Sequence, residues 1–338
     1  MKSFATFGNE LYTGERSYEF VGKRKIWFSI TGVLLVLSIL IPLFGGGFNF
    51  GIDFRGGSQF TISSVTHTDV ATGESAVAAA VPGTAAVVTN IAGDTMQVQT
   101  DRLSDDQTLA VKDALKTAYG VTEDHITSTF VGPSWGQDVS RQAIIGFIVF
   151  VLLATVLMAL YFRTWRMSIA AMVGLLVVMV VTAGIYGASG FEVTPSAIIG
   201  FLTILSYSLY DTVVVFDKIR ENTADITKSE RRTFAEEVNL AVNQTLVRSI
   251  NTMMVAVLPV GSILFIGALL LGAGTLRDLS LALFIGIIVS TFSTVFVAAP
   301  MYAWLREREP DHLKQAKKVQ QRRAHEAEQD ATEVATTA

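Results

Sequence analysis

Six long apolar runs constrain this chain of 338 residues more than any other feature, because each run can cross a bilayer as a helix. The runs cover residues 26–46, 143–162, 167–189, 194–216, 251–271 and 280–303. Half of all residues are hydrophobic, only 17% are charged, and the mean hydropathy is +0.45. The sequence therefore predicts an α-helical polytopic membrane protein with six transmembrane helices.

The Lys and Arg residues predict the orientation of the chain in the membrane. Of the 26 basic residues, 20 fall before residue 26, between the second and third runs, in 217–250, or after residue 303. The positive-inside rule then places the N-terminal segment 1–25 and the C-terminus in the cytoplasm, with 47–142 outside. The first run ends in three glycines without a small-residue cleavage site, so we expect a retained anchor and not a cleaved signal peptide.

The segment 47–142 predicts a small extracytoplasmic domain between the first and second helices. Its core can be divided into strand 58–64, helix 74–81, strands 85–91 and 95–100, helix 104–119 and strand 126–131. Ser104 and Gln107 match a capping box for the second helix, and Gly120 suits its C-cap. The order β-α-β-β-α-β predicts a ferredoxin-like α+β fold. The segment has no His, Asp or Ser arrangement typical of catalysis, which favours a binding or coupling module.

Two glycine-bearing connectors flank this domain. GIDFRGG (51–57) precedes it and VGPSWG (131–136) follows it. Two interpretations stay open: ordinary connecting turns, or hinges that let the domain swing. The candidate hinge residues are Gly51, Asp53, Gly56, Gly57, Gly132, Pro133 and Gly136.

Asp211 lies inside the fourth apolar run, which contains no basic residue. A charge at that depth costs at least ~2.5 kcal/mol, so such a group usually moves protons, binds an ion or pairs with a buried cation. A purely structural polar contact between helices is the alternative. Tyr207 and Ser208 share a helical face with Asp211, and their hydroxyls could stabilise a neutral carboxylic acid or pass a proton.

A second polar group stands at the start of the fifth run. Arg248, Asn251 and Thr252 are spaced so that they share one helical stripe. Two interpretations of Arg248 stay open. It is either a snorkelling anchor at the membrane surface or a counter-charge for Asp211.

The remaining segments carry weaker signals. Within the loop 217–250, residues 230–247 are amphipathic and predict an interfacial helix lying along the cytoplasmic leaflet. The tail 304–338 is rich in charged residues, Gln and Ala, and we expect it to be disordered beyond a short surface helix. A net charge of −4 gives no support for a nucleic-acid partner. Neither a nucleophile–base pair nor a metal-ligand cluster is evident, so we expect no enzyme activity, cofactor or metal.

Five motifs in register resemble the SecF family, the smaller half of the SecDF protein-export complex in the resistance-nodulation-division superfamily. They are GIDFRGG (51–57), VGPSWGQDVSRQA (131–143), SYSLYDTVVVFDKIREN (206–222), RSINT (248–252) and GTLRDLSLALFIGIIVSTFSTVFVAAP (274–300). The resemblance covers about residues 20–305. Two positions depart from the family pattern: Tyr210 stands where many members have Asn, and Ser206 where Gly is common. Each departure could alter the hydrogen bonding of Asp211.

This resemblance implies a multi-pass subunit of the bacterial cell membrane that pairs with SecD. Such a complex uses the proton or sodium gradient to promote translocation of unfolded preproteins after SecA and the SecYEG channel, and YajC is a further candidate partner. By resemblance, Asp211 carries the proton, and Arg248, Asn251 and Thr252 complete the relay. Two alternatives stay open: a small-molecule or lipid exporter of the same superfamily, and a translocon scaffold without ion coupling.

Overall fold

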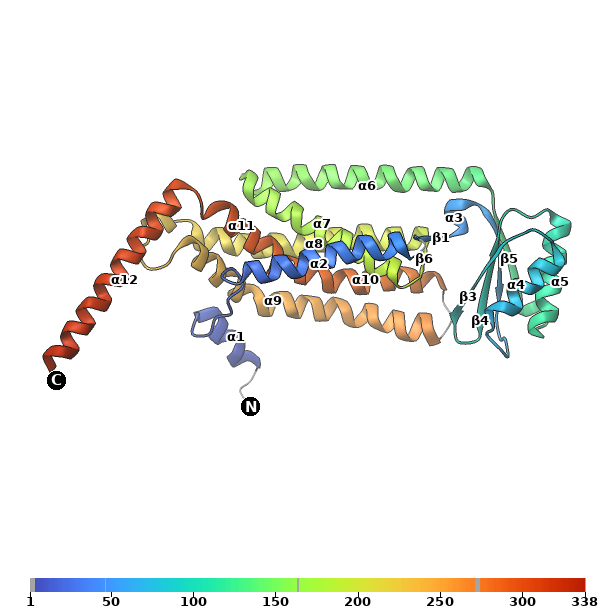
Figure 1. Cartoon of the computed structure of the whole chain (residues 1–338), viewed down its shortest axis with the longest axis horizontal. Helices are drawn as coiled ribbons and strands as arrows, with labels where there is room; N and C mark the ends of the chain where they lie inside the picture. Colours follow the sequence, from blue (N-terminus) through green and yellow to red (C-terminus); the bar gives the residue numbers. More distant parts are fainter. Residues whose placement is uncertain (1–3, 46, 163, 271–273, 338) are drawn as a thin grey trace.

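Long helices form a bundle that carries a small α+β domain at one end, and both chain termini lie toward the other end (Figure 1). The computed structural model describes residues 4–45, 47–162, 164–270 and 274–337. In these residues, 6 helices are long and apolar enough to cross a membrane, which confirms the prediction. Gly46 and Leu271, the last residues of two predicted spans, lie outside the described residues, as do 1–3 and 338.

The spans extend beyond the apolar runs at several ends. In order they are α2 (Arg24–Phe44), α6 (Pro133–Phe162), α7 (Trp165–Ala188), α8 (Pro195–Thr223), α9 (Phe234–Ser262) with η3 (Ile263–Leu270), and α10 (Gly274–Ser293) with η4 (Thr294–Ala298) and α11 (Ala299–Arg306). A short helix, α1 (Phe4–Thr13), precedes them. The apolar stretches of α7 and α10 are more than half buried, whereas those of α2, α6 and α9 are mostly exposed. Helices α7 and α10 therefore lie inside the bundle, and the exposed helices face lipid or another chain.

The small domain has the predicted ferredoxin-like order. Its elements are β2 (Gly57–Ile62), α4 (Val70–Ala80), β3 (Ala86–Ala92), β4 (Thr95–Thr100), α5 (Asp105–Tyr119), η1 (Glu123–His125) and β5 (Ile126–Val131). The sheet order is β3-β4-β2-β5, and every neighbouring pair is antiparallel. Both halves of the Ser104–Gln107 capping box form, and Gly120 ends α5 in the left-handed conformation at φ 67°.

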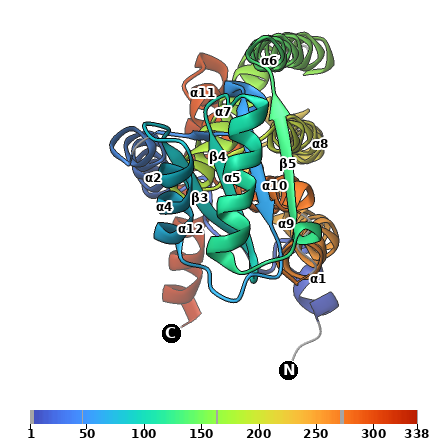
Figure 2. The same cartoon turned by 90° about the vertical axis from the view of Figure 1, so that its right-hand side faces the viewer.

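The two faces of this sheet differ in polarity because side chains alternate along a strand. Phe60, Val98 and their neighbours pack against helices α4 and α5 to form the domain core. Figure 2 shows these helices on the side of the sheet away from the bundle. The opposite face carries Gln59, Gln97 and Gln99, so a polar surface faces the membrane helices.

A second, very small sheet joins the connector before the domain to the bundle. Strand β1 (Asn49–Phe50) pairs in parallel with β6 (Glu192–Val193), which lies in the loop between α7 and α8. One turn of helix, α3 (Ile52–Arg55), then leads into β2.

The second span begins at Pro133, ten residues earlier than the predicted 143. Proline is favoured in the first turn of a helix because it has no N–H to leave unpaired there. A Cβ placed on Gly136 would lie 2.7 Å from the carbonyl oxygen of Phe54, so α6 packs tightly on α3 before it reaches the apolar run. Protein contact, and not hydrophobicity, stabilises these first turns, which is why the apolar pattern missed them.

The prediction of a separate interfacial helix at 230–247 was wrong. Residues 234–247 follow η2 (Ile226–Lys228) and form the first half of α9, continuous with the fifth span. Its apolar face packs on Phe216 and Tyr302 inside the bundle.

The tail is helical where disorder was expected. Helix α12 spans Pro310–Thr337, and its first turns bury His312, Gln315 and Val319. Gln315 donates hydrogen bonds to the carbonyl oxygens of Ser229 and Arg232, at 2.9 and 2.8 Å. The Ala, Glu, Lys, Arg and Gln that suggested disorder are also strong helix formers, and these contacts favour the helix.

Candidate functional site

Asp211 lies in the interior of the bundle, on the face of α8 that meets α9. Its side chain is 3% exposed. Oδ1 accepts a hydrogen bond from Oγ of Ser249 on α9 at 2.9 Å. Among the described residues, Oδ2 is buried and has no hydrogen-bond partner. The site therefore holds one enclosed carboxyl group with one oxygen available to a proton.

Hydroxyl groups surround this carboxyl group. Thr212, the next residue on α8, lies 3.2 Å from Thr294 between their Oγ1 atoms. Ser208 is buried one turn earlier on α8, and the buried hydroxyls of Tyr207 and Ser290 lack hydrogen-bond partners in the part of the chain that the structure describes. Such groups can donate or accept hydrogen bonds as the protonation of a neighbour changes.

Among the described residues, Asp211 makes no hydrogen bond with the predicted stripe of the fifth span, although Arg248 lies near enough to act on its carboxyl group electrostatically. Arg248 and Asn251 are exposed, and none of the ion pairs between described residues includes Arg248. The hydroxyl of Thr252 donates to the backbone oxygen of Arg248 at 2.9 Å. Ser249, which was not among the predicted site residues, makes the contact instead.

A signal for Ser249 was present in the sequence. The buried face of α9 begins at Phe234 and Val238 and continues at helical spacing through Val242 and Thr245 to Ser249. Treating 230–247 as a separate surface helix cut this stripe before it reached Ser249. If the segment is taken as one continuous helix, the spacing places Ser249 in the interior of the bundle and Arg248 at the edge of the buried face.

Polar side chains also occupy an exposed face at this level of the bundle. Ser206 and Tyr210 are exposed on α8, and Arg248 and Asn251 are exposed on α9. The two departures from the family pattern, Ser206 and Tyr210, therefore point away from the buried Asp211 contact. Polar and charged groups at membrane depth require a polar partner, so this face is suited to a second chain.

The glycine-bearing connectors are tightly packed. A Cβ on Gly51 would lie 2.8 Å from Oε1 of Glu192, and Gly136 has a similarly close neighbour in Phe54. Gly56 and Gly57 adopt positive φ angles of 76° and 136°, which side chains rarely tolerate. The other three candidate hinge residues take ordinary places: Asp53 lies in α3, Gly132 precedes α6, and Pro133 begins it. Hinge motion stays a prediction.

Side chains also tie the small domain to the bundle. Glu192 accepts hydrogen bonds from Nε2 of Gln97 at 2.8 Å and from Nε2 of Gln99. Arg277 on α10 is 8% exposed, and its Nη1 donates to the carbonyl oxygen of Ile91 in β3 at 2.6 Å. We call these contacts the domain latch.

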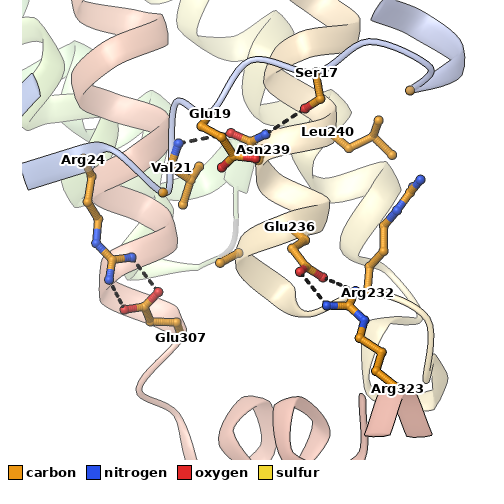
Figure 3. A pocket seen from close by; sticks show the side chains of 13 residues that line it. Ser17, Glu19, Val21, Arg24, Arg232, Glu236, Asn239, Leu240, Glu307 and Arg323 are labelled. Atoms are coloured by element: carbon orange, nitrogen blue, oxygen red, sulfur yellow. Dashed lines mark hydrogen bonds and ion pairs between the residues drawn. The ribbon is translucent and has the colours of Figure 1, made fainter. Parts of the chain in front are cut away.

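A polar cavity of about 470 Å³ lies at the opposite end of the bundle (Figure 3). Arg24 pairs with Glu307 at 2.6 Å, and Arg323 pairs with Glu236 at 2.9 Å. Oδ1 of Asn239 accepts hydrogen bonds from the backbone N–H groups of Phe20 and Val21. These contacts join the N-terminal segment, α9 and the C-terminal helices, so the cavity marks a junction between chain segments.

Comparison with known proteins places the chain in a family. The sequence model described as "Protein export membrane protein SecD/SecF, C-terminal" matches residues 110–308, and "SecD/SecF GG Motif" matches residues 43–65. The chain belongs to the SecD/SecF family. The glycine-bearing connector before the domain thus coincides with a motif of that family.

Within the SecD/SecF family, the chain is similar to proteins named protein translocase subunit SecF. It is 42% identical to that of Streptomyces coelicolor over 327 residues, covering 97% of this chain and 87% of the relative. It is 41% identical to that of Mycobacterium tuberculosis strain H37Rv, covering 90% of this chain and 70% of the relative.

A solved structure supports the same assignment. The crystal structure of SecDF from Thermus thermophilus matches with a TM-score of 0.75 at 30% identity. The match covers 87% of this chain and 39% of that chain. A second SecDF structure, in a super-membrane-facing form, matches with a TM-score of 0.60 over 93% of this chain. This SecD/SecF-family chain therefore corresponds to less than half of SecDF.

Proposed function

We propose that this chain is the SecF-type subunit of a bacterial protein-export complex, which pairs with a SecD-type chain and couples ion flow to the outward movement of unfolded preproteins. The similar SecF proteins, and a match to only 39% of the larger SecDF chain, support a subunit that needs a second half. We place it downstream of SecA and the SecYEG channel, with YajC as an additional partner. Both termini would be cytoplasmic, and the small domain would lie outside.

The enclosed carboxyl group of Asp211 carries this proposal. We propose H⁺ as the coupling ion, because the buried Oδ2 of Asp211 has no hydrogen-bond partner among the described residues and can take up a proton. A proton that crosses a potential of 100 mV releases ~2.3 kcal/mol, enough to bias a rearrangement of packed helices. The hydroxyl group of Ser249 donates to this carboxyl group and can adapt to a change in its protonation.

We assign Arg248, Asn251 and Thr252 to the partner-facing part of this relay. Their exposed face would meet the SecD-type chain, and an acidic group there would satisfy Arg248. The relay would then connect two chains: Asp211 and Ser249 inside this one, and Arg248 at the interface.

Preprotein export by cells that carry Asp211→Asn, with the SecD-type partner co-expressed, tests this function. We expect export to fall to the rate that the original protein shows with a protonophore, and to become insensitive to that protonophore. Asp217→Asn is a matched control, because Asp217 lies on the same helix and accepts a hydrogen bond from the exposed Tyr161 instead.

Two results would contradict the proposal. Unchanged rate and gradient dependence of export in Asp211→Asn, with normal insertion and partner binding, would remove Asp211 from the coupling and leave this chain the role of a scaffold. Export that responds to a sodium-selective ionophore but not to a protonophore would replace H⁺ with Na⁺ as the coupling ion.

A further inference from the structure

An apolar groove runs between α2 and α9 along the surface of α10, on the half of the bundle away from the small domain. Its volume is about 610 Å³. Apolar lining residues include Trp27, Leu246, Ile250, Met253, Ile288 and Phe292. From Phe292 to Ile288 the groove follows α10 for about 6 Å at 1.5 Å per residue, and it continues along η4 to Phe296. A groove of this polarity inside a membrane protein suits a hydrocarbon chain.

The mouth of the groove lies where the chain enters the first span. Lys23 directly precedes α2, lines the mouth and is exposed. It has no ion-pair partner among residues 4–45, 47–162, 164–270 and 274–337. One turn further on, the indole Nε1 of Trp27 is buried and has no hydrogen-bond partner in the same residues. The mouth of the groove therefore presents an exposed cation at the start of a membrane span, where lipid headgroups are expected.

We propose that the groove binds a zwitterionic phospholipid. One acyl chain would fill the groove, and the phosphate would meet Lys23. Glu19 also lines the mouth, so the two charged side chains cancel. An anionic headgroup gains nothing from a neutral entrance, whereas the ammonium of an ethanolamine headgroup can meet Glu19 while its phosphate meets Lys23.

The site is separate from the proposed ion relay. The groove reaches Thr291 on α10, one turn before Thr294, which contacts Thr212 beside Asp211. It does not include Asp211, Ser249 or Arg248 among its lining residues. A result that contradicts the ion-coupling proposal would therefore leave the lipid proposal intact. A result that contradicts the lipid proposal would likewise leave ion coupling intact.

Fluorescence quenching by brominated lipids tests the site in the full chain. With Trp135, Trp165 and Trp304 each changed to Phe, Trp27 is the remaining indole. In bilayers of phosphatidylglycerol, we titrate in brominated phosphatidylethanolamine. We expect half-maximal quenching at a mole fraction of brominated lipid at least threefold below the value for lipids that mix randomly around the protein. Lys23→Gln should move the midpoint to the random-mixing value. Lys25→Gln should not, because Lys25 is exposed but does not line the groove.

A groove-filling variant gives the second readout. Ile250→Phe with Met253→Phe should move the quenching midpoint to the random-mixing value. Val255→Phe, on the exposed face of α9, should leave the midpoint of the starting protein unchanged. The proposal is wrong if quenching of the starting protein follows the bulk lipid fraction, or if the filled groove still gives early quenching. Equal early quenching by brominated phosphatidylglycerol would overturn the zwitterionic assignment.

Discussion

Asp211 and Ser249 form a two-residue contact whose loss should be measurable apart from the loss of the carboxyl group itself. Ser249→Ala leaves Oδ1 of Asp211 without its donor, and an unpaired buried acceptor costs about 1–3 kcal/mol. We expect the pH dependence of gradient-driven export to shift, because the ionised acid loses a stronger, charge-assisted hydrogen bond than the protonated acid does.

Export rate as a function of external pH is the measurement for Ser249→Ala. Ser249→Thr keeps the hydroxyl and should restore the original profile. Ser262→Ala is the control on the same helix, since its exposed hydroxyl bonds only to a backbone oxygen. An unchanged profile in Ser249→Ala would remove Ser249 from the relay.

Asp211 could be found from the sequence because a lone carboxylate among apolar residues is conspicuous. Ser249 could not be found the same way, because serine is common in membrane helices and its role depends on which side of α9 it occupies. That side was fixed by packing of Phe234 and Val238, far along the same helix. The error thus came from dividing one helix in two.

Helix α12 shows how a single element can respond to pH. His312 is 4% exposed and lies against Phe234, with ring centroids 4.3 Å apart. Burial lowers the pKa of His312 below its ordinary value of 6.5, and the Arg306 cation lowers it further. The undocked helix therefore binds the proton more readily than the docked one.

We expect docking of α12 to be strongest above about pH 6.5 and to weaken as the pH falls below that value, because protonation of His312 then favours the undocked helix. Hydrogen exchange of the first turns of α12 at pH 5 and pH 7.5 checks this. His312→Gln should remove the pH dependence, whereas His325→Gln, exposed on the same helix, should preserve it. Equal protection at both pH values in the original chain would contradict the prediction.

The elements of the small domain were predictable because local signals and tertiary packing agree there. The Ser104 capping box, the Gly120 C-cap and the strand alternation all lie within the elements that they define. The start of α6 depends instead on its contact with α3, and the helical structure of the tail depends on contacts with residues 229–232. No local sequence pattern contains these contacts.

For the whole molecule, the domain latch predicts that the small domain and the bundle move as one body. A Gln97→Cys, Glu192→Cys pair joined by a short bifunctional thiol reagent should leave export nearly unchanged, because it links positions already in contact. Export before and after cross-linking is the measurement. If cross-linking stops export and cleavage of the cross-link restores it, the hinge interpretation of the connectors is favoured.

The latch also marks the limit of sequence reasoning at this scale. Arg277 donates a hydrogen bond to the carbonyl oxygen of Ile91, which is 186 positions away in the chain. Contacts of that separation depend on how the finished bundle presents its loops. A single sequence predicts the individual helices and strands, but not how the small domain contacts the bundle.

The pairing of β1 with β6 has a consequence for biosynthesis. Asn49 and Phe50 need Glu192 and Val193 as partners, and these emerge from the ribosome roughly 140 residues later, on the order of ten seconds at typical synthesis rates. During that interval the domain can fold, but its seat on the bundle does not yet exist. Membrane insertion of the α7–α8 hairpin should therefore be the event that fixes the domain's orientation, and a stalled nascent chain that ends before β6 should carry a folded but untethered domain.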